Sequence, residues 1–257
     1  MSNAKATSEE ELLHGGKVMS VWDHLAELRT HLVRSLLALV ITTGIGFFAA
    51  EPAIRFLQRP LKNALPEGAD VLHFTGPLEV FMVDMKVGFI LGILFGCPIC
   101  LWEFWRFFEP ALYPRERRYI LPFILGSTGF FFVGIAFSYF VMLPLMLHWL
   151  IGIGLEVGTP LITLKDYISM LLALEVGVGL IFEAPLIVIL LGMLDLVSVE
   201  ALSSSRKFVL LIIVVLAAVL TPPDVISQIA LTLPIYAMYE GAILVLRLLK
   251  RKKVKPA

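Results

Sequence analysis

Charged residues are scarce in this 257-residue chain. They make up 16% of the sequence, whereas soluble domains carry about 25%. Hydrophobic residues make up 58%, and the mean hydropathy is +0.88. This composition excludes an ordinary soluble domain and is typical of a polytopic membrane protein. The formal net charge of zero is less informative, because the placement of the charges matters more than their sum.

The motifs of common enzymes are also missing. The sequence has no phosphate-binding G-x-x-x-x-G-K-[ST] or G-x-G-x-x-G after a strand pattern, and no H-E-x-x-H. Within the hydrophobic runs, Ser127 and Ser138 have no histidine with them, and Asp84 is the only aspartate. These absences argue against nucleotide hydrolysis and intramembrane proteolysis. We therefore expect no enzyme activity, no catalytic residues and no cofactor.

The chain has only two cysteines, Cys97 and Cys100, in a C-x-x-C arrangement. Such a pair is compatible with a redox or metal site. The alternative is two small apolar residues within a spanning helix. This second interpretation is favoured because no histidine or further cysteine lies nearby to complete a site, so we expect no bound metal.

Residues 1–20 have no apolar core segment, so we expect no cleavable signal peptide there. We interpret 1–20 as a polar, disordered tail, 21–249 as a six-helix membrane domain and 250–257 as a basic C-terminal tail. The domain assignment depends on apolar runs of the length that a spanning helix needs, about 20 residues. These runs are 32–50, 80–102, 119–143, 167–193, 207–220 and 225–249. The fifth run is short for a span, and Asp224 after it is well placed to cap the sixth helix.

The distribution of Lys and Arg predicts the orientation. If all six runs span, sixteen of the 21 cations fall on the side that holds both termini, and four fall on the other side. The positive-inside rule then places both termini in the cytoplasm. The fold class that we predict is an all-α polytopic membrane protein with six transmembrane helices.

Two polar features lie on the predicted cytoplasmic side. The stretch "DHLAELRTHLVRS" reads as an amphipathic helix that leads into the first span, with Glu27 and Arg29 off its leucine stripe. The stretch "WEFWRFFEPALYPRERRY" places Glu103, Glu109 and Glu116 among aromatic residues. A carboxylate next to aromatic rings can bind a guanidinium group, which forms two hydrogen bonds with the carboxylate and stacks on a ring. The alternatives are an interface anchor for the first stretch and local salt bridges for the second.

Three glutamates, Glu175, Glu183 and Glu240, fall inside predicted spans. Ionisable groups in spans are costly and usually face a bundle interior, water or a partner. They are either structural acids bonded to neighbouring helices or sites of proton coupling. Proton coupling suggests an alternative function, a proton-coupled small-solute membrane transporter. The lack of a visible internal repeat counts against that alternative.

In these residues the sequence resembles the TatC family, the multispanning receptor subunit of the twin-arginine protein translocase. The resemblance covers about residues 20–250 and rests on five motifs in order. They are "HLAELRTHLVRS", "RPLKNALP", "FEPALYPRERRY", "FEAPLIVILL" and "LTPPDVISQIALTLPIYAMYE".

The resemblance implies a cupped bundle of six helices with short fifth and sixth spans in the cytoplasmic membrane of a prokaryote. It implies binding of twin-arginine signal peptides of folded precursors, and export driven by the proton-motive force. The implied partners are TatA-type and TatB-type single-span membrane proteins, membrane lipids and further copies of the chain in a receptor complex. Nucleic acid is not among them.

Individual roles follow from the same resemblance. Glu27 and Glu116 match the carboxylates that bind the signal arginines, while Arg29 and Phe107 match a basic and an aromatic position of that site. Four further positions match functional or partner-docking residues of the family, namely Pro60, Glu183, Asp224 and Gln228. Glu175 is not an expected acid in this family, and it remains unexplained together with Glu240.

Overall fold

The computed structural model describes residues 21–66, 72–108, 120–156, 158, 161–222 and 224–253. This part of the chain is helical and contains no β-strand beyond an isolated bridge between His73 and Thr163. Its elements in chain order are α2 (Val21–Phe48), α3 (Ala50–Leu57), α4 (Arg59–Ala64), α5 (Pro77–Phe108), α6 (Ile120–Phe137), the π-helical turn η3 (Ser138–Met142), α7 (Leu143–Leu155), α8 (Leu164–Ile181), α9 (Ala184–Met193), α10 (Val199–Ser204), α11 (Arg206–Leu220) and α12 (Val225–Lys253).

The elements form the six predicted membrane segments. The first, second and sixth are α2, α5 and α12, while the third is α6–η3–α7 and the fourth is α8–α9. Within the described residues, these five are long and apolar enough to cross a bilayer. The fifth, α11, has 15 residues, which at ~1.5 Å each make about 22 Å. It is shorter than a hydrocarbon core of about 30 Å, as the sequence predicted.

The third segment extends further than predicted. The predicted run ends at residue 143, whereas the helix continues to Leu155. Pro144 does not stop it, because the proline lies in the first turn of α7, directly after the π turn. The helix is continuous through this point: the Leu143 amide donates to the Ser138 carbonyl five residues back, and the wider π turn lies directly before the proline, which has no amide of its own to donate.

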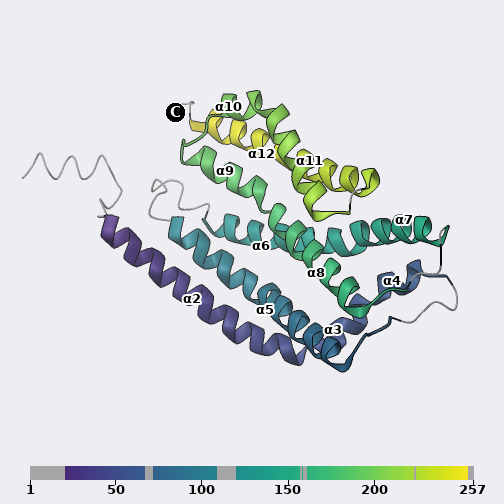
Figure 1. The fold of residues 1–257 in the computed structure, drawn as a ribbon. Helices are drawn as coiled ribbons and strands as arrows, with labels where there is room; N and C mark the ends of the chain where they lie inside the picture. The colour runs from purple at the N-terminus through teal and green to yellow at the C-terminus, as the bar shows by residue number, and fades with distance from the viewer. Residues whose placement is uncertain are drawn as a thin grey trace, which may run out of the picture.

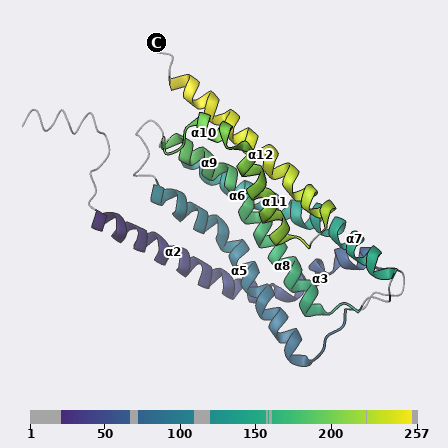
Figure 2. The same ribbon diagram turned by 45° about the horizontal axis from the view of Figure 1, so that its top comes forward.

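The helices are arranged as an arm and a bundle (Figures 1 and 2). Helices α2 and α5 run side by side in both views and form the arm, while α6, α8, α9, α11 and α12 form the bundle. The start of α2 and the end of α12 lie at the same end of the molecule. The end of α5 lies there too, and we call this end the termini face. The short helices α3 and α4 lie at the opposite end, α3 beside α5 and α4 beside α7.

Two different kinds of packing hold these parts together. Large buried side chains fill the bundle around α8, among them Leu171, Met142 and Met146. The arm instead depends on small residues: a Cβ atom added to Gly92 would overlap the backbone of Thr43. The close approach lets the Thr42 hydroxyl donate to the Gly92 carbonyl at 2.8 Å.

Candidate functional site

The termini face brings together side chains from α2 and α5. Glu27 and Arg29 lie near the start of α2, and Phe107 lies in the last turn of α5. Between the two helices, His31 Nδ1 is 2.6 Å from Glu103 Oε2. The Phe107 ring meets the His31 ring edge to face, with centroids 6.3 Å apart. Three of the predicted signal-binding residues therefore belong to one end of one helix pair.

Glu116, the fourth predicted signal-binding residue, lies outside the described residues, as does Glu109. The segment that contains them connects Phe108 at the end of α5 to Ile120 at the start of α6. It therefore leaves α5 one residue beyond Phe107.

Glu103 does not lie in the loop after the second predicted span, where we expected it together with Glu109 and Glu116. It lies inside α5, is buried, and pairs with His31, with Arg34 Nη1 3.9 Å away. The sequence analysis missed His31 altogether. A signal was available, because His31 follows Glu27 by four residues and so shares its helix face.

The two acids of the fourth segment both face the third. Glu183 precedes α9, where the fourth segment is broken, and it is only 7% exposed. It accepts a hydrogen bond from the Ser127 hydroxyl of α6. Glu175 on α8 is 4% exposed and has the Ser138 hydroxyl of η3 as a polar neighbour, but no hydrogen bond of normal geometry reaches its two oxygens within the described structure.

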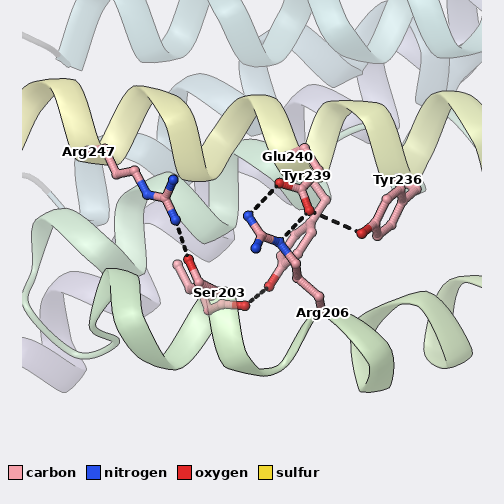
Figure 3. Close-up of polar contacts among 7 residues, drawn as sticks. Ser203, Arg206, Tyr236, Tyr239, Glu240 and Arg247 are labelled. Atoms are coloured by element: carbon pink, nitrogen blue, oxygen red, sulfur yellow. Dashed lines mark hydrogen bonds and ion pairs between the residues drawn. The ribbon is translucent and has the colours of Figure 1, made fainter.

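Glu240, unexplained in the sequence, has a partner in the structure (Figure 3). Arg206 at the start of α11 donates two hydrogen bonds to its carboxylate, at 2.6 and 2.9 Å. The Tyr236 hydroxyl donates a third at 3.1 Å. Nearby, Tyr239 bonds the Leu202 carbonyl at 2.9 Å. These contacts connect α10 and α11 to α12 and give the Glu240 carboxylate partners from two helices.

The predicted docking residues at the other end have internal contacts as well. Asp224 accepts from the Ser227 amide at 2.7 Å, which confirms that it caps α12. The Gln228 amide donates to the Val214 carbonyl at 3.1 Å and so ties α12 to α11. Pro60 is buried in the first turn of α4 and borders a pocket of about 260 Å³.

The two cysteines lie within α5 as free thiols. Cys97 is buried, and the Cys100 thiol faces the Ser35 carbonyl of α2 at 3.9 Å. Among the described residues, no group of three or more His, Cys, Asp or Glu side chains gathers at one place.

The fold and this site define a class of protein: a multi-pass helical membrane protein with a polar, aromatic-lined site at one end of its helices. Comparison with known proteins makes the class specific. Residues 23–234 match the family described as "Sec-independent protein translocase protein (TatC)". The chain belongs to the TatC family.

Relatives and solved structures agree with this assignment. The Sec-independent protein translocase protein TatC of Aquifex aeolicus (strain VF5) is 36% identical over 237 residues, which cover 91% of this chain and 98% of the relative. TatC of Escherichia coli (strain K12) is 33% identical, with 84% of each chain covered. A crystal structure of a twin-arginine translocase receptor, TatC, superposes with a TM-score of 0.76 at 36% identity and covers 88% of this chain and 98% of the other.

Membership of this family decides between the alternatives that the sequence left open. The chain is a non-enzymatic component of a Sec-independent protein translocase, with the six-span helical fold of that family. The small-solute transporter is not supported by any of these comparisons.

Proposed function

We propose that the chain is the receptor and core subunit of a twin-arginine translocase, and that it binds the signal peptides of folded precursors at the termini face. Glu27 and Glu116 receive the two signal arginines, with Arg29 and Phe107 beside them. The observation that carries this proposal is the placement of Glu27 and Phe107 at the same end of the α2–α5 pair. The segment with Glu116 follows Phe108, the residue after Phe107.

The chemistry of these groups favours arginine over lysine. A guanidinium donates two parallel hydrogen bonds to a carboxylate and stacks on an aromatic ring, whereas an ammonium is a point charge with neither option. Two carboxylates near an aromatic wall therefore select a pair of arginines.

The charge distribution supports a cytoplasmic termini face. Sixteen of the 21 Lys and Arg residues belong to segments at the side of both termini, which the positive-inside rule assigns to the cytoplasm. The inferred location is the cytoplasmic membrane of a prokaryote, where the proton-motive force drives export.

The partners that we propose are TatA-type and TatB-type single-span membrane proteins, with further copies of this chain in the receptor complex. Glu183 is the docking position that the family resemblance indicates; it lies at the break between α8 and α9, and its Oε1 atom is buried without a hydrogen-bond partner in the described structure. Docking therefore requires the side chain to turn outward, where a polar side chain of a partner helix would satisfy that oxygen in a medium without water. Pro60, Asp224 and Gln228 are the further docking positions. Photocrosslinking from position 183 tests the role, and crosslinks to lipid alone would contradict it.

Signal binding is tested on the purified protein in nanodiscs with a fluorescent signal peptide. We expect the Arg-Arg peptide to bind more tightly than its Lys-Lys counterpart. Glu27→Gln and Glu116→Gln should each weaken binding of the Arg-Arg peptide by about tenfold, which corresponds to ~1.4 kcal/mol. Glu51→Gln is the matched control, because Glu51 is an exposed acid at the opposite end, paired with Arg55. Unchanged affinity in Glu27→Gln, Glu116→Gln and their double variant would refute the assignment.

A further inference from the structure

The His31–Glu103 pair is a buried polar contact in the arm. The two side chains are 13% and 11% exposed, and the contact of 2.6 Å joins residues that are 72 positions apart. Buried polar groups of this kind fix geometry, because separating them leaves both without a partner. Arg34 lies at the rim, 3.9 Å from the same carboxylate oxygen.

The pair lies directly beneath two of the proposed signal-binding residues. Glu27 precedes His31 by four residues on α2, and Phe107 follows Glu103 by four residues on α5. Residues four apart lie one above the other on a helix face. The edge-to-face contact between the His31 and Phe107 rings connects the His31–Glu103 pair to the termini face.

Within the described residues, the side chains at this end of α2 are mostly exposed. Only 11% of the residues in the most apolar stretch of the first membrane segment are buried, and side chains such as Leu25, Leu32 and Leu36 are exposed. The Thr42–Gly92 hydrogen bond crosses the same helix pair at a different depth. It lies eleven residues from His31, or about 16 Å along the helix.

We propose that His31 and Glu103 are positioning residues that set the separation between Glu27 and Phe107, and with it the fit of the signal arginines. The pair does not touch the peptide. The pair fixes the distance and the rotation of the start of α2 relative to the end of α5. This matters for binding because the side chains of a site must be held within about 0.5 Å of their productive positions. The proposal rests on the signal-peptide function proposed above.

The first experiment measures signal-peptide affinity in folded protein. Glu103→Ala and His31→Ala should each weaken binding of the Arg-Arg peptide by about tenfold, or ~1.4 kcal/mol. The exchanged variant His31→Glu/Glu103→His restores the pair and should recover most of the affinity. Thr42→Val is the matched control, since it removes a buried hydrogen bond from the same helix pair without touching the termini face. It should lower thermal stability and leave the affinity unchanged.

The second experiment measures the helix separation directly. Spin labels at Thr30 and Arg106, both exposed, report the distance between α2 and α5 in a background with Cys97 and Cys100 replaced by alanine. The distance distribution should broaden in Glu103→Ala, narrow again in the exchanged variant, and stay narrow in Thr42→Val. A merely structural role would affect Thr42→Val and Glu103→Ala alike.

The two proposals fail in different ways. If the wild-type protein does not prefer the Arg-Arg peptide, the signal-peptide function is refuted, and the distance measurement alone decides whether the pair sets the helix separation. If the wild type prefers it but Glu103→Ala binds it equally well, the positioning role is refuted. Failure of the exchanged variant to recover affinity, when it is folded, refutes the positioning role as well.

Discussion

The arm and the bundle of this protein are stabilised in different ways. In the most apolar stretch of α2's membrane segment 11% of the residues are buried, whereas 56% are buried in the corresponding stretch of the fourth segment at the centre of the bundle. The arm is held by glycines that let two backbones approach closely, together with the contacts at Thr42 and His31. The bundle is held by large apolar side chains and contains buried acids.

Both arrangements can be understood from the lipid solvent. Lipid tails are as apolar as leucine, so helices in a membrane gain little from the hydrophobic effect and depend on close packing and hydrogen bonds. The arm should therefore be sensitive to any added atom at its contact. The bundle should be sensitive to how well each buried polar group is satisfied.

The largest effect that we expect comes from enlarging the arm contact. Gly92→Ala places a Cβ against the Thr43 backbone, and overpacking of this kind costs about 3 kcal/mol. Gly44→Ala is the matched control on α2, because a Cβ there meets nothing within 4 Å. It should be neutral or stabilise the helix by up to about 1 kcal/mol. Thermal unfolding in detergent measures both, and equal melting temperatures would contradict the close-packing account.

An effect of intermediate size and opposite sign is expected at Glu175. Its buried oxygens lack hydrogen bonds within the described structure, so Glu175→Leu should raise the free energy of unfolding by about 1 kcal/mol. Glu183→Leu removes the acceptor of Ser127 and should lower it by a similar amount, about 1 kcal/mol. Thermal unfolding of the two variants measures both changes. If Glu175→Leu also destabilises the protein, the Glu175 carboxylate has a polar partner that stabilises the fold.

A smaller effect is expected at the joint of α10, α11 and α12. Glu240→Gln removes the bidentate partner of Arg206 and should lower the melting temperature, but by less than Gly92→Ala, since both groups are about a third exposed and screened. The exchanged variant Arg206→Glu/Glu240→Arg should recover part of the loss. Arg247→Gln serves as the control, because it removes a single exposed bond to Ser203. A loss in Arg247→Gln equal to that in Glu240→Gln would argue against a special role for the bidentate pair.

The smallest effect is expected on the outer face of the arm. Leu36 is exposed on α2, so Leu36→Ala should change the free energy of unfolding by no more than about 0.5 kcal/mol. A chemical-denaturation curve in the same detergent checks this. A loss of several kcal/mol would mean that another chain covers this face.

Much of the fold could be predicted from the sequence, because the features that determine it are local. The apolar runs, the short fifth span and the cap at Asp224 each depend on neighbouring residues, and the structure confirms them. The extension of the third segment past Pro144 was not predicted. The helix changes from α to π geometry at Ser138–Met142 and then continues, and hydropathy does not predict such a change.

The polar contacts could be predicted only in part, because they join residues that are distant in the sequence. Glu240 and Arg206 are 34 positions apart, and His31 and Glu103 are 72 apart. From a single sequence we can infer that a buried acid needs a hydrogen-bond or ion-pair partner, but not which residue provides it. The resemblance identified Glu27 and Phe107 as members of a site, and the structure adds the pair that lies between their helices.

The π-helical turn η3 has a consequence for the way the chain tolerates insertion and deletion. A π turn holds one residue more than an α-helical turn, and each residue turns a helix by about 100°. Because the wide turn holds its extra residue within about one full turn, removing one residue from Ser138–Met142 would regularise the helix and leave α7 nearly unrotated. In a helix without such a turn, the same deletion would rotate everything after it by about 100°. Met146, Leu147 and Ile151, which are buried, would therefore stay in the core, and the π turn is a place where this chain can lose a residue without repacking α7.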